Sequence, residues 1–176
     1  MMGYQWYVLQ VRTGREREIA DDLIRHGVEG LVPTEERLIR RGGKWHRVEY
    51  VLMSGYVFVR CRYASTMYYM LRKIPGVQRW LTADGKPAPL YPDEEARILY
   101  LGARTLTPSY VYRQPGGGYT ILSGPLQGLR DNIREIDWHR RRARVVLPVL
   151  GENRSIWLSI DTTAAAAEKA SQPALG

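Results

Sequence analysis

The sequence predicts an α+β fold in two parts, and three observations indicate it. The first 103 residues alternate short β-branched and aromatic runs with segments of helical periodicity. A stretch rich in proline and glycine, without periodicity, begins near Arg104. Beyond it come short strand-like runs separated by turn residues. We therefore predict one domain at residues 1–103, a linker at 104–118, a small β-barrel domain at 119–163 and a disordered tail at 164–176.

The chain opens with a predicted strand at Trp6–Val11, a run of aromatic and β-branched residues. A helix is predicted over residues 15–26, because apolar residues recur there at helical spacing. Thr13 and Glu16 have the spacing of a capping box, in which each side chain binds a free backbone amide at the helix start. Gly27 follows the last helical residues and is expected to end the helix.

A β-hairpin is predicted next. Its strands are Glu35–Ile39 and Trp45–Leu52, and Arg40–Lys44 form its tip. The following strand, Gly55–Cys61, alternates its side chains between two faces. In that register, Cys61 is predicted to be a small core residue rather than a nucleophile.

Two further helices complete the first part. One is capped by Ser65, runs through Met70, Leu71 and Ile74 and stops at Pro75-Gly76; the other starts at Pro92, with acidic residues in its first turn, and ends just before Gly102. The second part contains four predicted strands: Tyr119–Leu122, Arg134–Asp137, Arg144–Val149 and Ser155–Ile160. Pro148 and Gly151 would interrupt a helix there. We therefore expect this part to be a β-structure in the full chain.

Composition and charge exclude several classes of protein. The 176 residues include 26 Lys and Arg against 18 Asp and Glu, a formal charge of +8, which favours a polyanionic partner. No apolar run approaches the roughly 20 residues that span a bilayer, and the amino terminus lacks the features of a signal peptide. We expect a cytoplasmic protein without membrane contact. One cysteine and three scattered histidines exclude a disulfide framework and give no metal-ligand spacing, so neither metal nor cofactor is expected.

Six short motifs together resemble the NusG family of transcription elongation factors. They occur in the family's order and cover about residues 4–163: Trp6–Gln10, Val32–Glu36, Arg41–Gly43, Gly55–Val57, Pro75–Val77 and Ser123–Leu126. The opening Trp6–Arg15 is most similar to the LoaP branch of specialised antitermination factors. The resemblance implies an N-terminal four-stranded antiparallel sheet, flanked by helices, that binds the clamp helices of RNA polymerase. It also implies a C-terminal KOW domain, a five-stranded barrel that binds other factors or, in the LoaP branch, RNA.

The resemblance also implies an apolar surface that receives the polymerase helices. Its candidate residues are Trp6, Tyr7, Met53 and Tyr56. The alternative is that these side chains form the core of the sheet. Two departures from the family pattern bear on the interfaces: Met53-Ser54 replace a phenylalanine and a proline, and Asp131 replaces the glycine of the KOW loop. Methionine still fills an apolar contact, and aspartate tolerates a left-handed turn.

Basic residues gather at the predicted hairpin tip, where Arg40, Arg41 and Lys44 lie between Arg37 and Arg47. In one interpretation these side chains only solvate the tip. In the other they track the phosphates of upstream DNA or of the displaced non-template strand, without reading sequence. Trp45 and His46 could then add base stacking.

The densest basic cluster lies between two predicted strands of the second part. It consists of Trp138, His139, Arg140, Arg141, Arg142 and Arg144. Guanidinium groups pair with phosphates and stack on bases, so we predict RNA contact rather than a merely solvated turn. Arg130, Arg134 and Arg154 are candidate flanking contributors. On an extended strand, Arg140, Arg142 and Arg144 would share one face and Arg141 would point away.

The sequence shows no catalytic constellation, so an enzyme is not expected. Ser123–Pro125 lacks the pattern of a nucleophile elbow, and Gly116–Gly118 is not followed by the lysine of a phosphate loop. The favoured function is an operon-specific antiterminator that binds RNA polymerase as a monomer and contacts a structured leader RNA. Two alternatives stay open: a housekeeping elongation factor whose KOW domain binds proteins, and an autonomous RNA-binding or ribosome-associated KOW protein.

Overall fold

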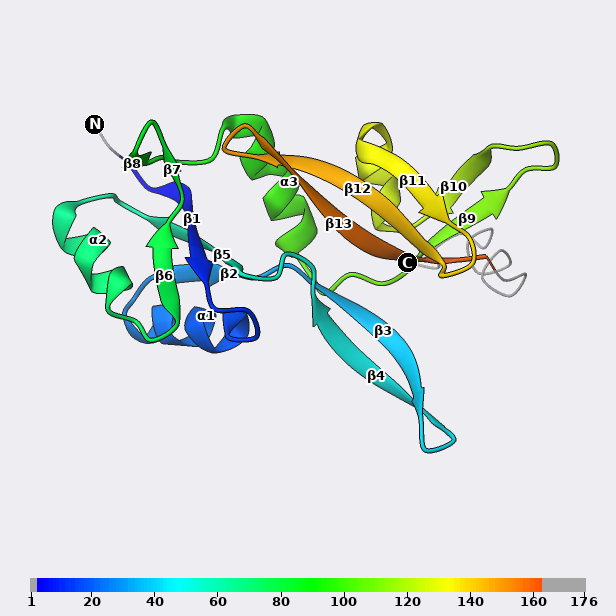
Figure 1. Ribbon diagram of the computed structural model, residues 1–176, viewed down its shortest axis with the longest axis horizontal. Helices are drawn as coiled ribbons and strands as arrows, with labels where there is room; N and C mark the ends of the chain where they lie inside the picture. The colour runs from blue at the N-terminus through cyan, green and yellow to red at the C-terminus, as the bar shows by residue number, and fades with distance from the viewer. Residues whose placement is uncertain (1–2, 163–176) are drawn as a thin grey trace, which may run out of the picture. The chain divides into compact units, whose positions relative to one another are not determined.

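The computed structural model describes residues 3–162, which form two compact units (Figure 1). The first unit contains the described residues up to Pro33, together with Val51–Arg104 and Pro148–Glu152. The second contains Thr34–Tyr50, Thr105–Leu147 and the described residues from Asn153 onward. The segment of the predicted hairpin therefore groups with the C-terminal strands. The tail predicted at 164–176 lies outside the described residues.

The first unit is built on a four-stranded sheet with the order β2-β5-β1-β6. β1 (Gln5–Val11) lies antiparallel to β5 (Tyr56–Cys61) and β6 (Val77–Trp80), and β2 (Glu29–Leu31) lies antiparallel to β5. The same unit contains α1 (Glu16–Arg25), α2 (Ser65–Arg72), α3 (Pro92–Gly102) and a ribbon of β7 (Thr82–Ala83) and β8 (Lys86–Pro87). The predicted antiparallel sheet with flanking helices is confirmed. Within residues 3–162, no helix is long and apolar enough to cross a membrane.

One face of this sheet carries a hydrophobic core. Its buried members from the strands and helices include Tyr7, Leu9, Ile19, Leu23, Val57, Val59, Cys61, Leu71 and Trp80. The Trp80 ring packs edge-on against the Tyr7 ring, with 5.5 Å between the ring centres, and stacks on the Tyr68 ring, with 5.9 Å between the ring centres. Cys61 is 2% exposed, which confirms its prediction as a core residue. Burial raises the pKa of its thiol to about 11, so the thiol stays protonated at neutral pH.

The start of α1 is built differently from the prediction. Arg15 precedes the helix and no side chain caps it, so the capping box predicted for Thr13 and Glu16 is wrong. The buried carboxylate of Glu16 accepts hydrogen bonds from the backbone N–H groups of Gly14, at 3.0 Å, and Gly55, at 2.8 Å. Glu16 therefore ties the start of α1 to the turn before β5.

Most of the second unit is a curved five-stranded sheet with the order β10-β9-β13-β12-β11 (Figure 1). Its strands are β9 (Ser109–Arg113), β10 (Tyr119–Ser123), β11 (Ile133–Asp137), β12 (Arg142–Val149) and β13 (Glu152–Asp161). β9 pairs antiparallel with β10 and parallel with β13, and a 3-10 segment, η1 (Pro125–Asn132), links β10 to β11. The predicted β-structure is confirmed, whereas closure into a KOW barrel stays a prediction.

The segment predicted as a linker at 104–118 contains β9. Ser109, Tyr110 and Val111 are buried there, so the C-terminal sheet begins ten residues before the predicted boundary at 119. The proline and glycine residues on either side of β9 concealed this short strand in the sequence. β9 adds a fifth strand to the four predicted from residue 119 onward.

The predicted hairpin is present as a separate two-stranded sheet of β3 (Thr34–Arg41) and β4 (Lys44–Val51). Gly42 and Gly43 form its turn with φ of 60° and 76°. Two successive positive φ angles match the tight turn that joins twisted antiparallel strands, and glycine adopts them without a steric penalty. The residues 40–44 predicted as the tip therefore lie at the tip.

Candidate nucleic-acid interface

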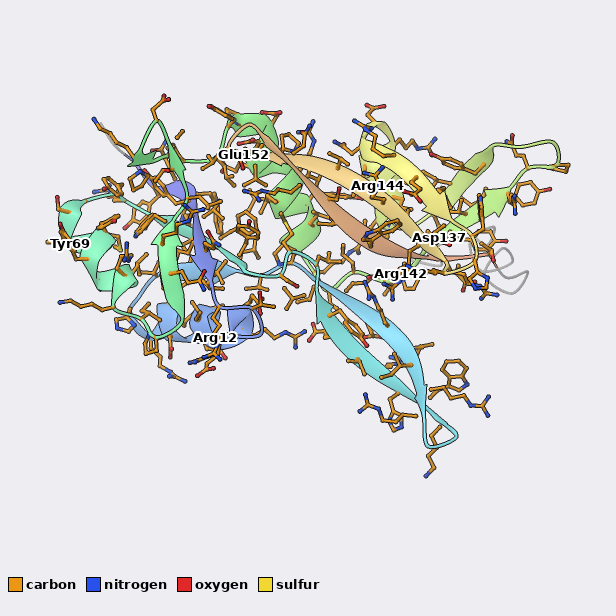
Figure 2. The ribbon with its side chains drawn as sticks, in the orientation of Figure 1. Arg12, Tyr69, Asp137, Arg142, Arg144 and Glu152 are labelled. Atoms are coloured by element: carbon orange, nitrogen blue, oxygen red, sulfur yellow. The ribbon has the colours of Figure 1, made fainter. Side chains whose placement is uncertain are left out.

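The predicted arginine cluster lies where β11 passes into β12, and Figure 2 shows Asp137, Arg142 and Arg144 at this junction. We call Arg140, Arg141, Arg142 and Arg144 the arginine turn. The Asp137 carboxylate accepts a hydrogen bond of 2.9 Å from the backbone N–H of Arg140. Arg141 adopts a left-handed φ of 55°, which reverses the chain. The backbone of the turn is thus fixed while the Arg140 and Arg141 side chains are exposed.

The four side chains of the arginine turn are not equivalent. β12 alternates half-buried and buried residues from Arg142 onward, so Arg142 and Arg144 share its outer face. Arg140 precedes the strand, and the expectation that it shares this strand face is wrong. Arg144 pairs with Glu135 at 3.2 Å and Arg140 with Asp137 at 3.9 Å. Within residues 3–162, the Arg141 and Arg142 guanidinium groups have no carboxylate within ion-pair distance.

Trp138, two residues before the arginine turn, contacts one basic and one aromatic side chain. The Arg113 guanidinium lies 5.3 Å from the centre of the Trp138 ring, and Tyr119 meets that ring at 6.4 Å. Trp138, Arg113 and Tyr112 also line a cavity of about 340 Å³. Sequence reasoning selected Trp138 but missed Arg113 and Tyr119, because they come from the segment taken as a linker and from a neighbouring strand.

The base of the β3–β4 hairpin is fixed to β13 within the second unit. Glu35, 1% exposed, accepts hydrogen bonds from the Ser159 backbone N–H at 2.6 Å and from the Arg37 guanidinium at 2.9 Å. Arg37 also donates to the Trp157 carbonyl at 3.4 Å and lies over the Tyr50 ring at 4.5 Å. These contacts hold the hairpin against β13.

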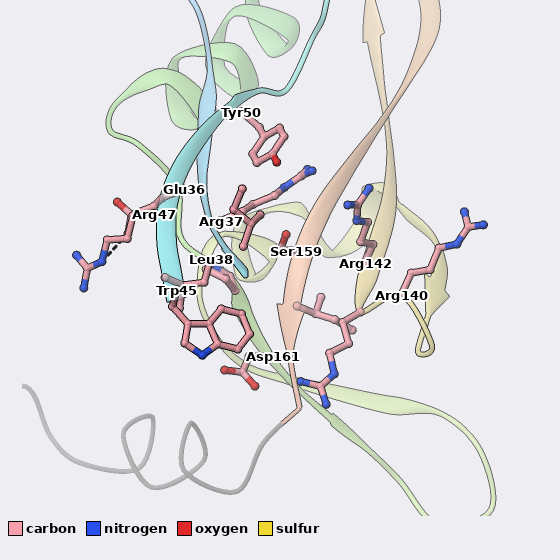
Figure 3. A pocket seen from close by; sticks show the side chains of 14 residues that line it. Glu36, Arg37, Leu38, Trp45, Arg47, Tyr50, Arg140, Arg142, Ser159 and Asp161 are labelled. Carbon is pink, nitrogen blue, oxygen red and sulfur yellow. Dashed lines mark ion pairs between the residues drawn. The ribbon is translucent and has the colours of Figure 1, made fainter. Parts of the chain in front are cut away.

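An open groove of about 480 Å³ lies between the hairpin and the arginine turn, and we call it the hairpin groove (Figure 3). From the hairpin, its lining includes Arg37, Leu38, Trp45, Arg47 and Tyr50. From the C-terminal sheet, it includes Arg140, Arg141, Arg142, Ser159 and Asp161. Two basic regions that are about 100 residues apart in the sequence thus border a single groove.

The other predicted nucleic-acid residues occupy different places. Arg40, Arg41 and Lys44 are exposed at the hairpin tip, outside the groove lining. His139 is exposed in the turn before Arg140. Arg130 and Arg134 donate to backbone carbonyls of Ile121 and Asp131, and Arg154 is half-buried on β13. The structure therefore gathers Arg140, Arg141 and Arg142 with the hairpin but does not add the flanking arginines to this groove.

Of the residues predicted to contact polymerase, three are buried. Trp6, Tyr7 and Met53 are each at most 5% exposed, whereas Tyr56 is half-buried. Tyr7 belongs to the hydrophobic core, where burial, and then Cys61 and Tyr63, raise the pKa of its hydroxyl. The expected surface position of Trp6 and Met53 is therefore not observed. Their role in polymerase binding stays a prediction, and Tyr56 is the accessible member of the set.

The described residues contain no group of three or more His, Cys, Asp or Glu side chains that could hold a metal ion. The interface instead offers guanidinium groups, indole rings and backbone amides. Such groups bind phosphates and stack on bases, and they are not suited to transferring protons or activating water.

Comparison with known proteins finds similarity to transcription factors of the termination and antitermination class. Residues 4–99 match the family model described as transcription termination factor nusG. Over 160 residues the chain is 31% identical to the transcription termination/antitermination protein NusG of Pasteurella multocida, covering 84% of this chain and 87% of that protein. It is 25% identical over 168 residues to the protein of the same name from Buchnera aphidicola, covering 88% and 92%.

A solved structure of NusG from Thermotoga maritima, described as showing the interaction of its domains, has a similar fold. The TM-score is 0.57 at 23% identity, with 90% of this chain and 95% of that chain covered. The chain belongs to the NusG family. Its relatives are named as transcription factors, which agrees with the expectation that this protein is not an enzyme.

Proposed function

We propose that this NusG-family protein is an operon-specific antitermination factor of the LoaP type that binds RNA polymerase and a structured leader RNA. The similarity of Trp6–Arg15 to the LoaP branch supports the specialised role. The observation that carries the RNA contact is the arginine turn. It places four guanidinium groups at one end of the C-terminal sheet, two residues after Trp138 in the sequence.

In this mechanism, the two parts of a monomer act on one transcription complex in the cytoplasm. Residues 1–103 bind the clamp helices of polymerase, with Tyr56 contributing apolar area to the contact. The KOW part holds the leader RNA through the arginine turn. Simultaneous binding raises the local concentration of each part at the other's site. The bound factor favours the closed clamp and suppresses pausing and hairpin termination.

The hairpin tip gives this function a second nucleic-acid contact. Arg40, Arg41 and Lys44 are exposed around the Gly42-Gly43 turn. Their charges suit the phosphates of upstream DNA or of the displaced non-template strand, which they would track without reading bases.

An RNA titration at two salt concentrations tests the central claim. The probe is the leader RNA of a candidate target operon, and the variant replaces all four residues of the arginine turn with alanine. We expect at least about a tenfold loss of affinity and a shallower salt dependence. A control variant replaces four exposed basic residues of the first unit, Arg62, Arg72, Lys73 and Lys86, and removes the same charge. Its affinity should stay within about twofold of the parent.

Co-purification with RNA polymerase separates the alternatives. A chain that binds polymerase but not RNA would be a housekeeping factor whose KOW part binds proteins. A chain that binds RNA but not polymerase would be an autonomous RNA-binding protein, which would contradict the proposed antitermination role.

A further inference from the structure

We propose that the hairpin groove binds one unpaired nucleotide of single-stranded RNA, with the base on Trp45 and the phosphate at the arginine turn. This inference deepens the function proposed above and rests on it, because it assumes that the arginine turn meets RNA. It adds that the β3–β4 hairpin takes part in RNA binding and that the RNA must be unpaired there.

The size and stiffness of the groove suit a nucleotide. Its volume of about 480 Å³ lies within the range of about 300–1,000 Å³ typical of small-molecule sites. One wall is the hairpin, which the buried Glu35 carboxylate fixes to Ser159 of β13. The other wall is the arginine turn, where the backbone N–H of Ile160 donates to the Arg141 carbonyl at 3.0 Å. Both walls are therefore anchored to β13, and the groove is preformed.

The charge of the groove favours a phosphate. Its lining contains five arginines against two acids, Glu36 and Asp161. Arg37 is engaged by Glu35, and Arg47 lies 3.7 Å from the Glu36 carboxylate. The arginine turn supplies the remaining three. Of these, Arg140 lies 3.9 Å from the Asp137 carboxylate, and Arg141 is the residue with the left-handed backbone. A bidentate guanidinium contact to a phosphate is therefore expected at Arg141.

An apolar platform borders the same groove. Trp45 is 66% exposed and Leu38 is 62% exposed, and both line the groove from the hairpin side (Figure 3). A tryptophan this exposed adds nothing to the core of the hairpin, whose sheet has only two strands. Its flat face offers a stacking surface to any base. Trp45 and the arginine turn thus present the two groups that a nucleotide needs, a base platform and a phosphate site.

The polar residues on the floor favour an unpaired ribonucleotide. Ser159 and Asp161 line the groove from β13, and a carboxylate beside phosphate-binding arginines would repel a second phosphate. It can accept hydrogen bonds from a base amine or from a ribose 2′-OH, the group that distinguishes RNA from DNA. A base held in a duplex is stacked on its neighbours and cannot reach Trp45, so paired RNA would not fill the groove.

The test uses the full chain and a labelled oligoadenylate RNA of about 12 nucleotides, with one base replaced by the fluorescent analogue 2-aminopurine. Trp45→Ala should weaken binding by at least about fivefold and remove the fluorescence quenching that stacking causes. Trp45→Phe should retain most of both. Tyr69→Ala, which removes a ring that is 63% exposed on α2, is the matched control and should change neither.

Two comparisons show whether the groove or the whole function fails. If the alanine variant of the arginine turn loses RNA but Trp45→Ala binds like the parent, the groove inference is overturned and the proposed function stands. If neither variant loses RNA, both fail. A perfect duplex of the same sequence should show no dependence on Trp45, and equal dependence would overturn the claim of an unpaired base. Equal affinity for the matching DNA strand would overturn the assignment to RNA.

A double-mutant cycle tests whether Trp45 and Arg141 contact the same nucleotide. Combining Trp45→Ala with Arg141→Ala should cost less affinity than the product of the two single losses, because either change already displaces the nucleotide. Independent, multiplicative losses would place the two residues on separate RNA contacts and overturn the shared site.

Discussion

The Glu35 carboxylate accepts a hydrogen bond of 2.6 Å from the backbone N–H of Ser159, 124 residues further along the chain. Its second oxygen receives the Arg37 guanidinium at 2.9 Å. The backbone around Glu35 adds to this junction, since the N–H of Glu36 donates to the Leu106 carbonyl and that of Leu106 to the Thr34 carbonyl. One buried acid therefore joins the hairpin to the strand that carries the floor of the groove.

Replacing Glu35 with alanine should destabilise the second unit. The change leaves the Arg37 guanidinium and the Ser159 N–H without their carboxylate in a buried place, which costs about 3 kcal/mol in the free energy of unfolding. Urea denaturation followed by tryptophan fluorescence measures it. The neighbouring Glu36→Ala removes a carboxylate from a longer pair with Arg47, whose side chain is 78% exposed. That control should change the free energy of unfolding by less than about 1 kcal/mol. Equal losses from the two variants would show that the buried hydrogen bonds of Glu35 do not stabilise the second unit.

Local sequence signals were sufficient for the elements whose stability is local. The hairpin could be predicted from two runs of strand-forming residues around Gly42-Gly43. The apolar stripe of α1 predicted both ends of the helix to within about one residue. The capping box failed because Thr13 and Glu16 satisfied its spacing while Gly55, 39 residues away, competed for the Glu16 carboxylate. A spacing rule contains no information about a partner that distant.

Long-range pairing hid the rest of the fold and of the candidate site. β9 is a strand because β13 and β10 pair with it, and its five residues lie between glycine- and proline-rich turns. The hairpin groove could not be predicted either, since its two walls are about 100 residues apart in the sequence and are both held by β13. Nor could the burial of Trp6 and Met53 be predicted, because a large apolar side chain fits a covered position and a binding surface equally well.

Tyr56→Ala should weaken polymerase binding without unfolding the first unit. Tyr56 is half-buried at the start of β5, so truncation removes apolar contact area at the surface and leaves the buried core in place. We expect at least about a fivefold loss in retention by immobilised polymerase, the minimum for a contact that contributes about 1 kcal/mol. Tyr69→Ala on α2 is the exposed control. If both variants are retained like the parent, Tyr56 does not belong to the polymerase contact.

Met53→Asp is expected to act on stability instead. Met53 is 4% exposed, and a carboxylate in that place would be buried without a partner. The free energy of unfolding should fall by about 3 kcal/mol or more. Thermal denaturation followed by circular dichroism measures this, and a variant as stable as the parent would mean that Met53 opens to solvent. Any loss of polymerase binding in Met53→Asp must therefore be compared with its folded fraction.

Gly124→Ala, which adds one methyl group, should strongly lower the free energy of unfolding of the second unit. Gly124 has φ of 96° and ψ of −174°, a region that is almost exclusive to glycine. A Cβ there would lie 2.6 Å from the Cα of the buried Ser109, whose hydroxyl accepts a hydrogen bond from the Leu126 N–H. We expect a loss of about 3 kcal/mol in the free energy of unfolding, measured by urea denaturation.

Gly116→Ala is the matched control for Gly124→Ala. Gly116 also has a positive φ, 85°, but a Cβ there meets nothing within 4 Å. It should lose only about 1 kcal/mol, the cost of the backbone conformation alone. The difference between the two variants combines the contact with Ser109 and the rarer backbone conformation of Gly124, and equal losses would show that neither adds to the cost.

The free energy of unfolding should fall as pH rises from about 9 through about 11. Burial raises the pKa of Cys61 from 9.0 to about 11 in the folded state and also raises that of Tyr7. The unfolded chain therefore loses these protons at lower pH than the folded chain, so the stability they contribute is full below pH 9 and is lost as pH rises through the folded pKa. Urea denaturation across this range measures it. Cys61→Ala and Tyr7→Phe should each reduce the slope, and an unchanged slope in both variants would assign the alkaline loss to other groups.

The members of the arginine turn should contribute unequally to RNA binding. Arg141→Ala should have the largest effect, because its exposed guanidinium has no ion-pair partner within residues 3–162 and the alanine keeps the Cβ that the left-handed backbone already tolerates. The salt slope for a single-stranded probe should lose about 0.7 log units per log unit of salt, the value for one phosphate contact. Arg144→Ala should have the smallest effect, since Glu135 at 3.2 Å already neutralises part of its charge.

Glu135→Ala provides the reciprocal test of this order. Removing the carboxylate frees the Arg144 guanidinium for phosphate, so RNA affinity should rise and the salt slope should steepen by up to about 0.7. Glu152→Ala, which removes an exposed acid at the far end of β13, is the charge-matched control and should leave the slope unchanged. If Glu135→Ala and Glu152→Ala raise affinity equally, the gain comes from net charge alone. In that case the ion pair with Arg144 does not set the order of contributions within the turn.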